Sequence, residues 1–251
     1  MYEEAKLAFE NYISNYDLKD DLISLKYYHT YKVVDLMAEI AYRLNLDKEH
    51  LELAKIIGLL HDIGRFEQIK KFNIISDKVT NTDHANESCV YLFDNGHIRD
   101  FIKDNKYDSI ILKAIINHNK LKIENGLSSE ELMYAKMIRD MDKIDIFRVL
   151  ATNYPDSFNA SQVTEEVLKS FSLHESVDNN LVKTDTDKTI SRLSFIFDIN
   201  YDESLDILVS TDNFDLYLAT IDVDSNSEKL WKKLREVCFD TINKGVNSNE
   251  W

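Results

Sequence analysis

The chain has 251 residues, of which 44% are hydrophobic and 30% charged, which is typical of a globular protein and excludes a disordered or fibrous one. Its formal net charge of −15 argues against extended DNA or RNA as a partner, because an acidic surface repels long polyanions, but it leaves room for a small anion in a local basic pocket. Five glycines and one proline are few turn formers, so we expect an all-α fold rather than a sandwich or barrel.

The cysteines and the N-terminal residues indicate the cellular compartment in which the protein is expected. Cys89 and Cys238 form no CxxC pair and are too few for a disulfide framework. The opening residues, MYEEAKLAFENY, are acidic and lack the basic start and apolar run of a signal peptide. No apolar stretch approaches the roughly 20 residues of a membrane span. We therefore expect a cytoplasmic protein with no membrane partner.

Residues 22–46 form the first clear amphipathic segment, with one stripe of residues spaced three and four apart. The stripe consists of Leu22, Leu25, His29, Val33, Leu36, Ile40 and Leu44. Asp47 then predicts the N-cap of a second helix, 51–60, which is apolar nearly all round and is expected to be buried. This helix runs into His61 and Asp62, and Gly64 is its predicted C-terminal stop.

The stretch 72–82 has the composition of a loop, with weak strand character at 72–75. Asp83 predicts the start of a short helix that ends at Gly96. Asp108 is the predicted N-cap of the next helix, 109–120, in which His118 lies on an apolar face.

Two capping-box patterns predict further helix starts. Ser128 and Glu131 open a helix that is expected to run through about Leu150. Ser225 and Glu228 give the same pattern before the last helix.

The only proline, Pro155, marks a break in the helical pattern. We therefore expect one helical domain over residues 1–155 and a C-terminal helical extension over 156–251, packed on it as one unit.

Polar side chains on apolar stripes need partners, because burying them unpaired costs roughly 1–3 kcal/mol. His29 interrupts the first stripe, and His61 and Asp62 end the buried second helix. In MIRDMDKIDIFRV, periodicity selects Asp142 as the inward carboxylate, because Asp140 lies roughly 200° round the helix from it.

Each of these residues also has a structural interpretation. A lone histidine on an apolar face is more often a satisfied core residue than a ligand, and Asp62 is placed to cap a neighbouring turn. If the four side chains converge, two imidazoles and two carboxylates form a site suited to Mn²⁺, Fe²⁺, Co²⁺, Ni²⁺, Zn²⁺ or Mg²⁺. The lack of thiolates argues against a structural zinc site, and four protein ligands leave open the positions that a catalytic ion requires.

The order His29 … His61-Asp62 … Asp142 resembles the H…HD…D signature of the HD superfamily of metal-dependent phosphohydrolases. YYHTYKV, LLHDIGRFEQ and RDMDKID are similar to that family's first, second and last motifs, over about residues 20–150. The resemblance implies an HD-domain-like helical bundle, with these four residues as metal ligands and Asp62 also in catalysis. It implies hydrolysis of a phosphate ester, typically in nucleotides or signalling nucleotides.

Two further histidines stand where some relatives hold a second ion. His84, in TDHANES, and His118, in INHNK, are therefore candidates for a second metal or a phosphate contact. In two-metal relatives the later motif often reads His-His, whereas this chain has His118-Asn119. The GYP motif of cyclic-dinucleotide phosphodiesterases is absent. No role is predicted for the remaining histidines, His50, His97 and His174.

The main hypothesis is a phosphohydrolase that acts on a small phosphorylated metabolite resembling a nucleotide, with a metal-activated water attacking phosphorus. Arg65 is the candidate phosphate clamp, because a guanidinium pairs with phosphate in a bidentate way. Lys120 and Lys143 are weaker candidates. His84 or His118 is the predicted acid that protonates the leaving oxygen, because imidazole titrates near neutral pH.

Two other functions fit the same residues. A di-iron oxygenase is one, because some HD-fold relatives hold two irons and activate O₂, and it requires both His84 and His118 as ligands. A metal-stabilised binding or regulatory module without turnover is the other, and the intact ligand set argues against it.

Overall fold

The computed structural model describes residues 1–246, which divide into two compact units. Unit 1 is Met1–Asp142 and unit 2 begins at Lys143. The division falls inside helix α9 (Ser129–Asn153), whereas the sequence analysis places the domain boundary at residue 155. The reason is that α9 continues through the last ligand motif without a break and contributes residues to both units.

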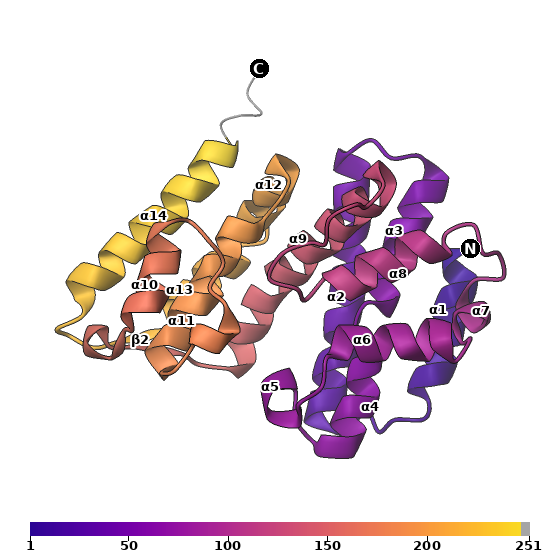
Figure 1. The fold of residues 1–251 in the computed structure, drawn as a ribbon, viewed down its shortest axis with the longest axis horizontal. Helices are drawn as coiled ribbons and strands as arrows, with labels where there is room; N and C mark the ends of the chain where they lie inside the picture. The colour runs from indigo at the N-terminus through magenta and orange to yellow at the C-terminus, as the bar shows by residue number, and fades with distance from the viewer. Residues whose placement is uncertain (247–251) are drawn as a thin grey trace. The chain divides into compact units, whose positions relative to one another are not determined.

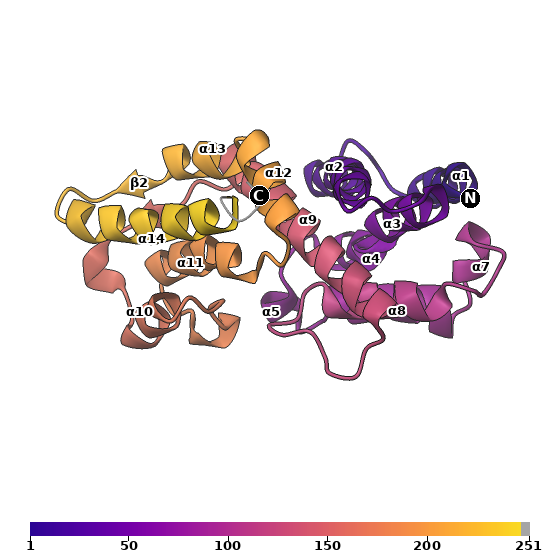
Figure 2. The same cartoon turned by 90° about the horizontal axis from the view of Figure 1, so that it is seen from above.

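Unit 1 consists of helices, as expected for an all-α protein, and Figure 1 shows them from indigo to magenta. Its helices before α9 are α1 (Tyr2–Ile13), α2 (Asp21–Arg43), α3 (Lys48–Leu60), α4 (Ile63–Phe72), α5 (Asp77–Thr80), α6 (His84–Cys89), α7 (Ile98–Phe101) and α8 (Asp108–Asn117). A π-helical turn, Val90–Asp94, extends α6. Figures 1 and 2 show α2 beside α3, on which it packs, and Figure 1 shows α6 between α4 and α8, both of which it contacts.

The predicted stripe of the first helix is the packing face of α2. Val33, Met37 and Ile40 are fully buried, and α2 packs closely on the apolar α3. Glycine at position 58 permits this approach, because a Cβ there would lie 3.2 Å from the Cα of Val34. Burial of this face supplies the hydrophobic stabilisation that holds His29 in the interior.

Gly64 does not end a helix, and that prediction is wrong. Helix α3 ends at Leu60 and α4 starts at Ile63, so Gly64 lies in the first turn of α4. A Cβ at Gly64 would lie 2.6 Å from the backbone nitrogen of Ser88 and 2.9 Å from the carbonyl oxygen of His84. Glycine is therefore needed for the close approach of α4 and α6, and this approach brings Asp62 next to His84.

Three predicted helix starts are confirmed by their hydrogen bonds. Asp47 accepts from the backbone N–H of His50, at 2.9 Å, and Asp83 accepts from that of Ala85, at 3.1 Å. The capping box before α9 is reciprocal: Glu131 accepts from the backbone of Ser128, whose hydroxyl accepts from the backbone of Glu131.

Three local predictions are wrong. Residues 72–75 form no strand, because α4 continues to Phe72 and Asn73 adopts a left-handed conformation with φ 52°. Asp108 is the first residue of α8 rather than its cap, which is Tyr107. Helix α14 (Glu228–Val246) starts at Glu228, so Glu228 is too early in the helix to complete a capping box with Ser225.

Unit 2 is also helical, apart from one short parallel strand pair. Its elements after α9 are β1 (Ser157–Phe158), α10 (Glu165–Ser172), α11 (Asp185–Leu193), α12 (Asp202–Ser210), α13 (Asn213–Thr220), β2 (Asp222–Val223) and α14, with 3₁₀ turns at Ala160–Gln162, Asn179–Leu181 and Ser194–Asp198. The buried carboxylate of Asp156 contacts Arg192 and accepts a hydrogen bond from Tyr217, at 2.6 Å, which fixes the chain before β1. Within residues 1–246, no helix has the length and apolar character needed to cross a membrane.

Candidate metal centre

Six buried imidazole and carboxylate side chains converge in unit 1. They are His29 of α2, His61 and Asp62 at the junction of α3 and α4, His84 at the start of α6, His118 directly after α8, and Asp142 of α9. None is more than 9% exposed, so each has lost most of its contact with bulk water. Such groups are stable in an interior only when they are paired or bind a cation.

The first group consists of His29, His61 and Asp142. The carboxylate oxygen Oδ1 of Asp142 lies 3.1 Å from Nε2 of His29 and 3.7 Å from Nε2 of His61. Donor atoms at about 2.0–2.2 Å from one cation are separated by about 3–4 Å from each other, so these spacings match a shared ion.

The second group consists of Asp62, His84 and His118. Oδ1 of Asp62 lies 3.3 Å from Nε2 of His84 and 3.7 Å from Nε2 of His118. The other oxygen of the same carboxylate, Oδ2, lies 3.8 Å from His29 and 3.7 Å from His61. Asp62 therefore faces both groups, with one oxygen toward each.

Hydrogen bonds at Nδ1 set the tautomers of three imidazoles. Nδ1 of His61 donates to the carbonyl of Gly58 and Nδ1 of His118 to that of Ile115, both at 2.7 Å. Nδ1 of His84 donates to the carboxylate of Asp77, at 2.6 Å. A carbonyl or carboxylate only accepts, so the proton of each neutral ring is on Nδ1 and Nε2 presents a lone pair to the centre.

The donor set fits a divalent cation. Nε2 of His84 and Nε2 of His118 lie 2.9 Å apart, so two lone pairs face each other and require a positive charge between them. Nε2 of His61 and Oδ1 of Asp62 are buried and make no hydrogen bond within residues 1–246. Nitrogen and oxygen donors without thiolate suit the divalent ions from Mn²⁺ to Zn²⁺, and Mg²⁺.

Local charges keep these groups in the protonation states that bind a cation. Burial by itself raises the pKa of Asp62, but Lys26 and the nearby imidazoles outweigh burial and hold it well below its usual range. Asp142 follows the same pattern, because His29 and His61 lower its pKa more than burial raises it. Burial, and then the charge of Arg65, lower the pKa of His84 to about 4. Both carboxylates are thus ionised, and His84 is neutral, at pH 7.

Each of the three predicted phosphate-binding cations is paired with a carboxylate. Arg65 donates to Asp77, at 2.6 Å, and its Nε is 3.8 Å from Asp62. Lys120 pairs with Asp83. Lys143 lies 2.8 Å from Asp198 and belongs to unit 2.

Sequence reasoning missed Lys26, whose ammonium lies 2.6 Å from Oδ2 of Asp62. Lys26 stands one helical turn before His29 on α2, and its side chain is 13% exposed. That spacing of three residues, which puts both on adjacent faces of one helix, is the signal that could have identified it.

The other residues considered in the sequence lie outside both groups. Asn119, which replaces the second histidine of some two-metal relatives, donates to Asp83 at 2.8 Å and leaves the His84–His118 pair intact. Asp140 is fully buried and is not a member of either group. The histidines without a predicted role, His50, His97 and His174, are also outside both groups.

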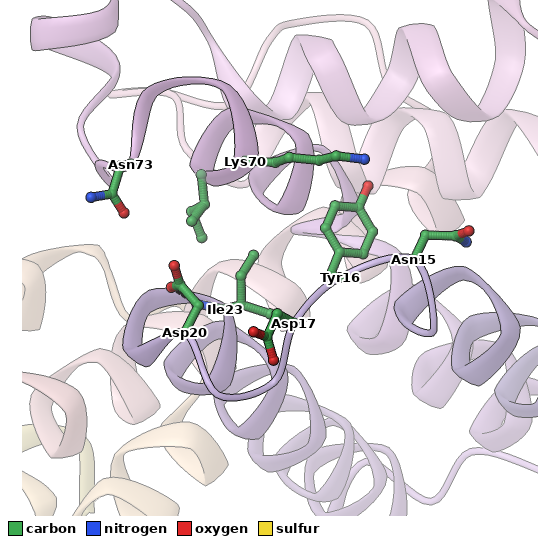
Figure 3. Close-up of a pocket in the computed structure, with 8 residues that line it drawn as sticks. Asn15, Tyr16, Asp17, Asp20, Ile23, Lys70 and Asn73 are labelled. Carbon is green, nitrogen blue, oxygen red and sulfur yellow. Dashed lines mark hydrogen bonds between the residues drawn. The ribbon is translucent and has the colours of Figure 1, made fainter.

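A separate pocket of about 450 Å³ lies between the α1–α2 connection and the end of α4. Figure 3 shows Asp17 and Asp20 on one side of it and Lys70 and Asn73 on the other. Asp20 is occupied as the N-cap of α2, and none of the six convergent residues lines this pocket. The candidate centre is therefore the buried cluster and not this pocket.

Residues 27–146 match the HD domain family, and this range contains all six residues of the cluster. No curated protein and no solved structure matches the chain significantly.

Proposed function

Residues 27–146 form an HD domain, the domain of the HD superfamily of metal-dependent phosphohydrolases, and from that premise we propose that the chain hydrolyses a phosphate ester of a small, nucleotide-like metabolite. The observation that carries the proposal is the carboxylate of Asp62, which has four imidazoles and one lysine within 4 Å. They are His29, His61, His84, His118 and Lys26. A small substrate is favoured over a polymer because the net charge is −15.

We assign two cation positions that share Asp62. His29, His61 and Asp142, with Asp62 beside them, would hold the first, and Asp62, His84 and His118 would hold the second. When bound, divalent ions supply Lewis-acid chemistry: they generate hydroxide from water near neutral pH and neutralise charge on the phosphate oxygens.

The protein's own residues position the ester and balance its charge. Lys26, beside Asp62, is the cation closest to the shared carboxylate and is placed to donate to a phosphate oxygen. This assignment replaces Arg65 as phosphate clamp, because Lys26 is closer to Asp62, at 2.6 Å against 3.8 Å for Arg65, and Arg65 also donates to Asp77.

His84 and His118 serve in this proposal as cation ligands and not as the acid that protonates the leaving oxygen. Both rings have Nδ1 engaged, and their Nε2 atoms face one another and Asp62. The pKa of His84, lowered to about 4, leaves almost no protonated ring at neutral pH, so His84 has no proton to give.

The test is metal analysis together with a phosphate-release screen of nucleotides and nucleotide second messengers. We expect one or two divalent ions per chain and turnover of a narrow set of small phosphate esters. His61→Ala and Asp62→Ala should abolish both the ion content and turnover, because each removes a donor from the centre. An Asp62→Ala protein that hydrolyses substrate at the parental rate contradicts the proposal.

Matched controls are His97→Ala and Asp100→Ala. His97 and Asp100 pair with each other on the surface, and their side chains are 44% and 63% exposed. Both variants should keep ions and activity. Asp140→Ala is a poor control, because Asp140 is fully buried and its loss would disturb packing.

An oxygenase is the second candidate, favoured by the convergence of His84 and His118 on Asp62. It predicts an iron-dependent optical spectrum and O₂ consumption, with no phosphate release. Metal-dependent stabilisation with neither activity would instead indicate a regulatory module.

A further inference from the structure

The partner that orients His84 differs in kind from those of His61 and His118. His61 and His118 each follow a helix, and their Nδ1 atoms donate to a carbonyl three residues earlier in that helix. His84 is the first residue of α6, so no helical carbonyl precedes it. A side chain from another segment, Asp77 of α5, takes that place at 2.6 Å. The orientation of this one imidazole therefore depends on where α5 lies.

Polar side chains hold α5 in position. None of its residues is buried, so apolar packing contributes little. Arg65 and Gln68 of α4 donate to Oδ1 of Asp77, at 2.6 and 3.0 Å, while Oδ2 of the same carboxylate accepts from His84. The same amide nitrogen of Gln68, which has two hydrogens to share, lies 2.9 and 2.7 Å from the hydroxyls of Thr80 and Thr82.

We propose that Asp77 is a positioning residue for the second cation, and that residues 73–82 are a latch whose docking and cation binding stabilise each other. The inference rests on the second cation position of the proposed function. A carboxylate on Nδ1 holds the ring in the tautomer that presents the Nε2 lone pair and makes that nitrogen a stronger donor. Because the coupling is reciprocal, a cation at His84 must in turn favour the docked latch.

The first test is a calorimetric titration of the metal-free protein with Mn²⁺ alone, without substrate. Asp77→Asn should weaken binding of the second ion by 10- to 100-fold, the range seen when an outer carboxylate is lost, and should change the first by less than about threefold. His84→Ala should remove the second ion completely.

Asp83→Asn is the matched control, because it removes the same charge from the residue next to His84. Asp83 contacts Lys120 and Asn119 rather than the imidazole, and asparagine retains its capping ability. This variant should keep the second ion within about threefold. Equal weakening by both variants would show a general effect of charge and overturn the proposal, as would equal loss of both ions in Asp77→Asn.

The second test is hydrogen exchange of the amides of residues 73–84. Saturating Mn²⁺ should slow their exchange in the parent and much less in Asp77→Asn. Exchange that is unchanged by Mn²⁺ in the parent overturns the latch, and a parent that binds one ion overturns the inference. Neither result depends on turnover, so an inactive protein that shows both effects would refute the proposed hydrolysis alone.

Discussion

At the scale of single residues, Lys26 is the least expected member of the centre. Its ammonium is 2.6 Å from Asp62, and a lysine donates three hydrogen bonds, so one contact leaves two for a substrate. Lysine on an amphipathic helix ordinarily keeps its ammonium in water, whereas the side chain of Lys26 is only 13% exposed and its ammonium pairs with Asp62.

Lys26→Met should therefore lower kcat/KM by 10- to 100-fold, because a hydrogen bond to a charged group contributes about 1.5–3 kcal/mol. Steady-state kinetics on the substrate found by the screen measure the loss, and metal analysis should show unchanged ion content. Lys71→Met, a change on the exposed side of α4, is the control and should leave the kinetics unaltered. Parental kinetics for Lys26→Met would remove Lys26 from the site.

Residues differ in how well the sequence predicts them. The burial of His29 was predictable because it interrupts an apolar stripe, and that of His61 and Asp62 because they end a buried helix, whereas their role as ligands was implied only by the family resemblance. Asp77 was not, because its contact with His84 joins α6 to a segment that has only the composition of a loop. Contacts of this kind depend on tertiary placement, which spacing along the chain does not encode.

At the scale of helices, the contact of α4 with α6 places His84 next to Asp62, the carboxylate that the two proposed cation positions share. Gly64 stands at that contact, where a Cβ would meet backbone atoms of Ser88 and His84. The helices around this contact were predictable, but Gly64 was predicted to end a helix, because glycine is common at helix C-termini.

Gly64→Ala should destabilise the metal-free protein by about 1–3 kcal/mol, the usual cost of overpacking, because backbone cannot move aside as a side chain does. It should also weaken the second ion more than the first, since α6 carries His84. Denaturant unfolding and the Mn²⁺ titration measure the two effects.

Gly126→Ala provides the comparison, since nothing lies within 4 Å of a Cβ there. Its φ of 85° makes alanine unfavourable for the backbone alone, so stability should fall while both ions are retained. Normal affinity for the second ion in Gly64→Ala would show that α6 is not held by this contact.

At the scale of the whole molecule, the all-α class and the helical order were predictable from the stripes, the caps and the scarcity of turn formers. The division at residue 142 was not, because α9 has no break there and supplies residues to both units. The sequence of a continuous helix has no feature that marks where the helix passes from one unit to the next.

Removal of metal should destabilise unit 1 and not unit 2. All six donors lie in residues 1–142, and an ion at 100 times its Kd adds about 2.7 kcal/mol to the folded state. A chelator should therefore speed hydrogen exchange in α2, α3 and α6 and leave α10 to α14 nearly unchanged. Equal loss of protection in both units would show that they unfold together.

The shared carboxylate has a further consequence for how the protein would respond to metal supply. A cation bound beside Asp62 neutralises part of the carboxylate charge that would attract a second cation. The occupancies of the two proposed cation positions therefore cannot vary independently. Scarcity of divalent ions would therefore leave a population of singly loaded molecules, whose remaining ion is held with a different strength. The concentration of free metal, and not only of substrate, would then govern the rate.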